Sequence, residues 1–179
     1  MYSSSGVLFE EVLSGMDMVN TEAGELDTIL NGILPGDFRT DFEANYTLTV
    51  EFAQFEKSMY FILYLPPEID FGEENPACTT LSGVDVPVLT CSADRTAKSL
   101  KFTDALKYAQ SNPGKIEILI DKLRNPLENI VTSSFKIDSF TYDGYEIDSL
   151  TSDVTVNFFC EYPCAECDPD NPSRCEECY

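Results

Sequence analysis

The 179-residue sequence contains no histidine, few basic residues and no long apolar run. Without histidine, the chain alone cannot build a Ser-His-Asp triad, a Cys-His pair or a His-containing catalytic zinc site. No stretch approaches the roughly 20 apolar residues that cross a bilayer. Glu10 and Glu11 interrupt the apolar part of YSSSGVLFEEVLSG near the N-terminus, which is therefore not typical of a signal peptide. We expect no enzymatic activity and no membrane insertion within this segment.

Basic residues number 11 against 32 acidic ones, giving a net charge of -21 and a pI near 4.1. Such a surface repels phosphate backbones and anionic lipids, so the charge argues against binding to nucleic acid or to a membrane surface. Divalent cations or a basic partner are more compatible with it. The same charge is also explained by solubility and mutual repulsion in a crowded extracellular layer.

Hydrophobic residues make up 43% of the chain, enough for one core and a small additional module. The clearest pattern spans residues 115–150, where KIEILID and SSFKIDSFTY alternate and Asp143-Gly144 indicates a turn. The side chains expected to line a core are Ile116, Leu119 or Ile118, Phe135, Ile137 and Phe140.

Two stretches before this region also predict strands. NYTLTVEFAQF alternates at Tyr46, Leu48, Val50 and Phe52, as in a half-buried strand. SMYFILYL is more uniformly apolar and predicts a central strand covered on both faces, ending at Pro66-Pro67. The short link Glu56-Lys57 suggests that these are neighbouring strands of one sheet.

The other segments are less regular. GVLFEEVL could form a first strand, or could add as a strand to the open sheet edge of a neighbouring subunit. Residues 26–34 show a weak helical periodicity, residues 103–109 could form one or two helical turns, and Pro87 places VDVPVL at a sheet edge or bulge. DVTVNFF alternates as a last strand. Seven or eight short strands predict an all-β fold, an immunoglobulin-like antiparallel β-sandwich with a short disulfide-rich C-terminal tail.

The seven cysteines suggest an oxidising compartment. Cys78 and Cys91 flank VDVPVL and would form a local disulfide in a secreted module, or remain as free thiols in a cytosolic one. The tail CEYPCAECDPDNPSRCEECY holds the other five: Cys160, Cys164, Cys167, Cys175 and Cys178. Its two C-x2-C pairs would allow a zinc site, but the interval between them is shorter than in a zinc ribbon, and we favour disulfides.

Two further kinds of site are suggested by short motifs. Asn45-Tyr46-Thr47 is an N-glycosylation acceptor sequence. Asp168, Asp170 and Asn171 place hard oxygen donors close together and could bind Ca2+, although a proline-stiffened turn explains them equally well. Asp138, Asp143, Glu146 and Asp148 could likewise meet around a hairpin, or be ordinary exposed carboxylates. Apart from possible Ca2+, no cofactor is expected.

Residues 123–126 (LRNP), 132–137 (TSSFKI) and 143–148 (DGYEID) resemble the end of an immunoglobulin-like module of large cysteine-rich surface proteins from ciliates and other protists. The resemblance extends back to residues 45–50 and forward into the terminal cysteines, which resemble the start of a furin-like, growth-factor-receptor-type repeat. In that family the repeat follows the module and is held by disulfides. The resemblance implies structure and attachment rather than catalysis.

Together these features predict a lead-in segment at residues 1–29, a sandwich at 30–159 and the start of a cysteine-rich repeat at 160–179. The odd cysteine count and the missing signal peptide suggest a piece of a longer secreted chain. The expected function is a structural module of an extracellular coat or filament, such as a ciliary or flagellar hair. It would contact neighbouring modules of its own chain and form homo-oligomeric or filamentous assemblies at the cell surface, including a ciliary one. The alternative is an adhesion or receptor module binding glycan or protein through loops at one end of the sandwich.

Overall fold

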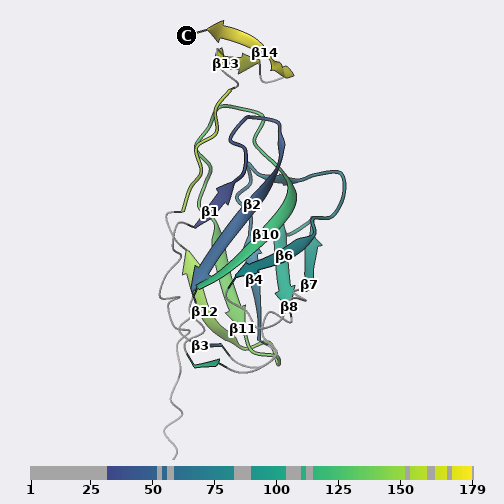
Figure 1. The fold of residues 1–179 in the computed structure, drawn as a ribbon, viewed down its shortest axis with the longest axis vertical. Coiled ribbons are helices and arrows are strands. Elements are labelled where there is room, and N and C mark those ends of the chain that lie inside the picture. The colour runs from purple at the N-terminus through teal and green to yellow at the C-terminus, as the bar shows by residue number, and fades with distance from the viewer. Residues whose placement is uncertain are drawn as a thin grey trace, which may run out of the picture.

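The computed structural model describes residues 32–51, 54–55, 59–82, 90–103, 110–111, 115–151, 154–160, 164–168 and 171–178. These residues form strands and connecting loops, and no helix occurs among them. The strands are β1 (Ile33–Pro35), β2 (Glu43–Glu51), β3 (Gln54–Phe55), β4 (Tyr60–Tyr64), β5 (Asp70–Phe71), β6 (Cys78–Ser82), β7 (Thr90–Asp94), β8 (Ser99–Thr103), β9 (Gln110–Ser111), β10 (Lys115–Arg124), β11 (Lys136–Phe140), β12 (Glu146–Thr151), β13 (Cys164–Asp168) and β14 (Asn171–Cys178). Figure 1 shows their arrangement.

Two antiparallel sheets form the body of the molecule (Figure 1). The first has the order β1-β2-β10-β5, with β6 also paired to β10. The second has the order β12-β11-β4-β8-β7. Side chains of both sheets meet in one buried hydrophobic cluster, so the chain is an immunoglobulin-like antiparallel β-sandwich, as the sequence predicts.

The alternation in the sequence identifies most of the core correctly. Tyr46, Leu48 and Val50 of β2 are buried, as are Ile116 and Ile118 of β10. Leu119, the other option for the second β10 position, is only half-buried, because it points to the opposite face from Ile118.

The β11 region agrees less fully with the expected core. Phe135 and Ile137 are buried. Phe140 is half-buried instead and stacks on Tyr60, with ring centroids 5.1 Å apart. Strand parity is the reason: Ile137 and Ser139 face inward, so Phe140 faces outward.

The expectation that β2 and β4 are neighbours in one sheet is wrong. β2 pairs with β1 and β10, whereas β4 pairs with β8 and β11 in the other sheet. β4 is central in its sheet, but only Phe61 and Leu63 are buried, and its other face is half-exposed rather than covered. A short link does not distinguish a hairpin from a connection that crosses between two sheets.

The last segment of the sandwich, residues 154–160, closes one side of it. Val156 and Phe158 are buried, which confirms the predicted alternation, but the segment forms isolated bridges at Asn157 and Phe159 instead of the predicted last strand. The segment is held by bonds from Thr132 N to Val156 O (2.9 Å) and from Phe158 N to Ile130 O (3.0 Å). On its other side, Phe159 N donates to Phe38 O (3.1 Å).

Several sequence predictions fall wholly or partly outside the described residues. They are GVLFEEVL, Phe52, the strand around Pro87 and the helical turns at 103–109, of which only Thr103 is described, at the end of β8. The helical periodicity of residues 26–34 is wrong where it can be compared, since Ile33 and Leu34 lie in β1. In the part of the chain that the structure describes, no helix has the length and apolar character to cross a membrane.

Candidate functional site

A disulfide bond joins the two sheets at one side of the sandwich. Cys78 lies in β6 of the first sheet and Cys91 in β7 of the second, with their Cα atoms 5.8 Å apart. Both cysteines are half-buried and pack against the hydrophobic core. The predicted pairing is confirmed, and we call it the inter-sheet disulfide. The sequence could not show that it links edge strands of different sheets.

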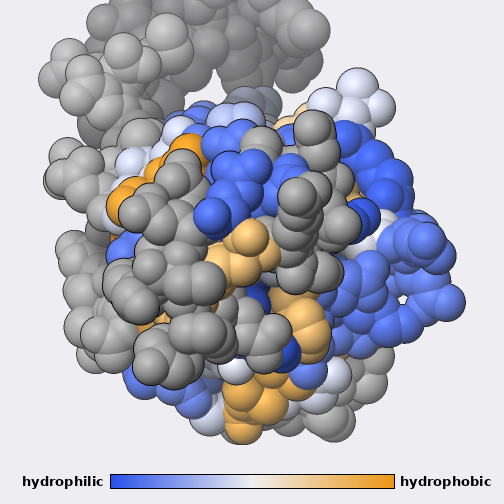
Figure 2. Space-filling model, turned by 90° about the horizontal axis from the view of Figure 1, so that it is seen from above, coloured by the Kyte–Doolittle hydropathy of each residue, from blue (hydrophilic) through white to orange (hydrophobic). Residues whose placement is uncertain are grey.

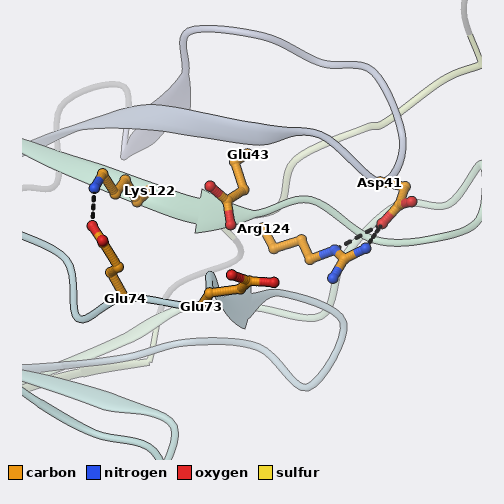
Figure 3. A pocket seen from close by; sticks show the side chains of 6 residues that line it. All are labelled: Asp41, Glu43, Glu73, Glu74, Lys122 and Arg124. Carbon is orange, nitrogen blue, oxygen red and sulfur yellow. Dashed lines mark hydrogen bonds and ion pairs between the residues drawn. The ribbon is translucent and has the colours of Figure 1, made fainter.

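A hollow of about 470 Å³ lies over the ends of β2 and β10, and the described side chains that line it are all charged. Figure 3 shows the six residues: Asp41, Glu43, Glu73, Glu74, Lys122 and Arg124. They come from β2 and the loop before it, from β10 and from the loop that follows β5. We call this feature the acidic hollow, because four carboxylates face two cations.

Both cations of the acidic hollow are already paired. Arg124 contacts Asp41, with Nε 2.7 Å and Nη2 2.5 Å from Oδ1, and Lys122 forms an ion pair with Glu74. The hydrogen bond between Lys122 and Glu74 lowers the pKa of Glu74 and raises the pKa of Lys122. Glu43 and Glu73 form no ion pair with any described residue, so the hollow offers two carboxylates to positively charged groups (Figure 3).

Local backbone geometry positions the walls of the acidic hollow. β10 has an irregularity between Ile120 and Leu123, and Lys122 within it has a positive φ of 56°. The opposite wall is the loop that follows β5, and Arg95 holds it in place. Its Nη2 donates to the carbonyl oxygens of Gly72, Glu73 and Glu74 at 2.9, 3.2 and 3.0 Å. Sequence reasoning missed this site, since its residues come from separate segments and share no motif.

The predicted glycosylation site is exposed. Asn45 lies in β2 with an exposed side chain, and Thr47 two residues later is half-buried. Tyr46 between them is fully buried and contributes to the core. Accessibility of Asn45 is compatible with a glycan, and its modification stays a prediction.

The cysteine tail forms a two-stranded hairpin of β13 and β14, which contains a disulfide between Cys164 and Cys175. Cys160 is also disulfide-bonded. Thiols engaged in disulfides are not available as zinc ligands. No group of three or more His, Cys, Asp or Glu residues able to hold a metal occurs among the described residues.

The proposed calcium ligands are only partly described. The backbones of Asp168 and Asn171 face each other across the β13–β14 hairpin, and Asp170 lies outside the described residues. Calcium binding at this turn stays a prediction.

The four carboxylates considered around the β11–β12 hairpin do not form one described cluster. Asp138 is only 3% exposed, and its carboxylate accepts hydrogen bonds from Lys136 Nζ and Ser149 Oγ, both 2.7 Å long. The bond to Asp138 raises the pKa of Lys136. Asp143 and Glu146 are exposed instead, while the side chain of Asp148 lies outside the description.

Large hydrophobic side chains are also exposed on this acidic molecule. They are Leu34, Phe42, Leu81, Leu127, Val131, Tyr142, Tyr145 and Phe159. Figure 2, which views the molecule from above, shows hydrophobic residues between hydrophilic ones. Tyr142 and Tyr145 are the most exposed of the set, at 77% and 74%.

Comparisons with known proteins found similar solved structures at low identity. The full-length major pilin SpaD from Corynebacterium diphtheriae aligns with a TM-score of 0.45 and 14% identity, covering 70% of this chain and 34% of the pilin. The RrgA Jo.In complex aligns at 0.39 and 11%, covering 70% and 75%. A Nocardia farcinica protein reported to have an immunoglobulin-like fold aligns at 0.39 and 16%, covering 71% and 96%.

This chain thus spans about a third of the length of that pilin. No family of known proteins matches the sequence, and no curated protein matches it.

Proposed function

We propose that this chain is a non-catalytic structural module of an extracellular or cell-surface assembly. The observation that carries the proposal is the inter-sheet disulfide between Cys78 and Cys91. Disulfides persist in oxidising compartments and are rare in the cytosol. A bond that fastens the two sheets at their edges adds resistance to separation of the sheets, which is a property that a load-bearing or exposed module needs.

The tail supports a connecting role. Its β13–β14 hairpin is short and is cross-linked by Cys164–Cys175, so it can stay folded without a large hydrophobic core. We propose that it acts as a disulfide-stabilised spacer between the sandwich and a following module, in a coat or a filament. The resemblance of the terminal cysteines to a furin-like repeat, noted from the sequence, agrees with this role.

The test uses unreduced protein isolated from the cells that make it. Peptide mapping would detect the Cys78–Cys91 link, and protease treatment of intact cells would show whether the protein lies outside them. Cross-linking before extraction would detect contacts between copies. We expect a complete inter-sheet disulfide, protease accessibility and cross-linked multimers. Reduced Cys78 and Cys91 in a protease-protected, monomeric protein would contradict the proposal.

A further inference from the structure

The tip of the β11–β12 hairpin presents two aromatic rings to solvent. Tyr142 and Tyr145 flank the turn at Asp143 and Gly144 and are 77% and 74% exposed. The turn between β11 and β12 lies at the lower end of the sandwich in Figure 1, whereas β2 begins and β10 ends toward the upper end. The tip is therefore far from the acidic hollow, which lies at the start of β2 and the end of β10. Two such exposed rings within four residues have no role in the core.

Hydrogen bonds fix the shape of the tip. Thr141 N donates to Tyr145 O (2.8 Å), Gly144 N donates to Thr141 O (3.0 Å), and Tyr145 N donates to Thr141 Oγ1 (3.1 Å). Gly144 has a φ of +87°, a conformation that other residues rarely adopt. The backbone that carries the two tyrosines is therefore ordered before any partner binds. Rigid tyrosines provide contact area at a low cost in conformational entropy.

The charged side chains of the hairpin itself have one sign. Asp143 and Glu146 are exposed beside the two rings, and no lysine or arginine occurs from residue 139 to residue 149. Two lysines lie on the same sheet, but both are engaged: Lys101 Nζ lies 3.8 Å from the centre of the Tyr60 ring, and Lys136 Nζ bonds to Asp138. The sheet thus already uses tyrosine rings to hold ammonium groups.

We propose that this hairpin tip binds a basic segment of another protein. Arginine or lysine side chains of the partner would lie over the rings of Tyr142 and Tyr145, and Asp143 and Glu146 would neutralise their charge. A cation over an aromatic face is attracted by the ring quadrupole, and neighbouring carboxylates increase the attraction. The proposal goes beyond a structural role, because it assigns a recognition surface and the chemistry of its partner.

A net charge of -21 attracts any polycation, so the experiment must separate the tip from the rest of the surface. The probe is a fluorescein-labelled peptide of alternating arginine and glycine with six arginines, titrated with the whole chain at physiological salt and followed by anisotropy. The variants are Tyr142→Ala with Tyr145→Ala, Tyr142→Phe with Tyr145→Phe, and Asp143→Asn with Glu146→Gln. Glu128→Gln with Glu176→Gln makes the same charge change at exposed positions outside both the tip and the acidic hollow.

We expect the double alanine variant and the Asp143→Asn, Glu146→Gln variant each to lose roughly tenfold in affinity. The double phenylalanine variant should stay within about threefold of the parent, because the rings remain. The Glu128→Gln, Glu176→Gln control should change affinity less than about twofold. Since the tip side chains are exposed, circular dichroism should show unchanged folding.

Three results would overturn the proposal. The first is no binding of the peptide by the parent protein. The second is an equal loss in the control and in the Asp143→Asn, Glu146→Gln variant, which would mean unspecific attraction to the acidic surface. The third is an unchanged affinity of the double alanine variant, which would exclude the rings from binding.

Discussion

The hydroxyl group of Tyr46 donates a 2.5 Å hydrogen bond to Oδ1 of Asn125, 79 residues later in the chain. Both side chains are buried, and burial raises the pKa of Tyr46 well above its ordinary range. The amide nitrogen of Asn125 also donates to the carbonyl oxygens of Asp37 (3.0 Å) and Arg39 (2.7 Å). One asparagine therefore connects β2, the end of β10 and the loop before β2.

Replacing Asn125 with alanine should lower the free energy of unfolding by about 3 kcal/mol, because it leaves two carbonyls and one hydroxyl without their partner. Tyr46→Phe should cost about 1.5 kcal/mol. Urea unfolding followed by circular dichroism measures both changes.

Asn157→Ala is the matched control, since Asn157 is exposed, and it should change stability by less than about 0.5 kcal/mol. In the double variant the cost of Tyr46→Phe should shrink, because its partner is already gone. Strictly additive losses would mean that the two side chains do not depend on each other.

Removing the inter-sheet disulfide by the double substitution Cys78→Ser and Cys91→Ser should lower the free energy of unfolding by about 3 kcal/mol. The bond links two residues that are 13 positions apart in the sequence and so restricts the conformations of the unfolded chain. Its loss increases the conformational entropy of the unfolded state. Denaturant unfolding without reductant isolates this bond, because Cys164–Cys175 stays intact. A loss below about 0.5 kcal/mol would contradict a stabilising role.

Gly32→Ala should destabilise the sandwich for two separable reasons. Gly32 has a φ of +58°, and an added Cβ would lie 2.2 Å from Cγ1 of Val154. The second substitution Val154→Ala makes room, so the Gly32→Ala change should cost less in that background. A cost of about 1 kcal/mol from the backbone conformation should remain. Thermal unfolding of the four proteins of this cycle tests it, and an identical cost in both backgrounds would exclude the clash.

Stability should depend on pH through Glu68. Burial alone would raise the pKa of this carboxyl, but hydrogen bonds from Ser133 Oγ (2.7 Å) and Ser133 N (3.1 Å) hold the pKa below its ordinary value of 4.5. A lowered pKa stabilises the fold above pH 4.5, and this contribution disappears as pH falls through the folded-state value.

Ser133→Ala should therefore cost about 1 kcal/mol at pH 7, and the cost should decrease below pH 4.5. Urea unfolding at a series of pH values measures it. In a Glu68→Gln background the effect of Ser133→Ala should no longer vary with pH, and a persistent variation would assign the titration to another group.

Asn45 should carry a glycan when the chain is secreted from a eukaryotic cell, because the side chain is exposed within an acceptor sequence. Intact mass before and after enzymatic deglycosylation detects it. Thr47→Ala should abolish the mass difference and Thr47→Ser should keep it. An unmodified Asn45 in fully secreted protein would exclude the site.

The sequence predicts the position of a strand where one face of that strand is buried and the other is exposed to solvent. β2 and β10 show this in the alternation of Tyr46, Leu48, Ile116 and Ile118, and the β11–β12 turn was visible at Asp143-Gly144. The assignment of strands to sheets did not follow, because alternation specifies the face of a residue but not its partner strand. The short link Glu56-Lys57 suggests that β4 lies beside β2, but such a link can equally connect strands of two different sheets.

A site could be predicted from the sequence only where its residues lie close together along the chain. The Cys78–Cys91 pair and the Asn45 motif are local signals. The acidic hollow combines Glu43, Glu73 and Lys122 from distant segments. It also needs the irregularity in β10, where Lys122 has a positive φ that a lysine in the sequence does not indicate. Only tertiary structure brings such groups together.

The segment that closes the sandwich also determines how the module would respond to tension. Arg39 and Phe159 pair in parallel, and Thr40 N donates to Phe159 O while Phe159 N donates to Phe38 O. A force that pulls residue 32 and residue 160 apart draws these two stretches in opposite directions along their length. The bonds between them are then loaded together, in shear, instead of opening one after another.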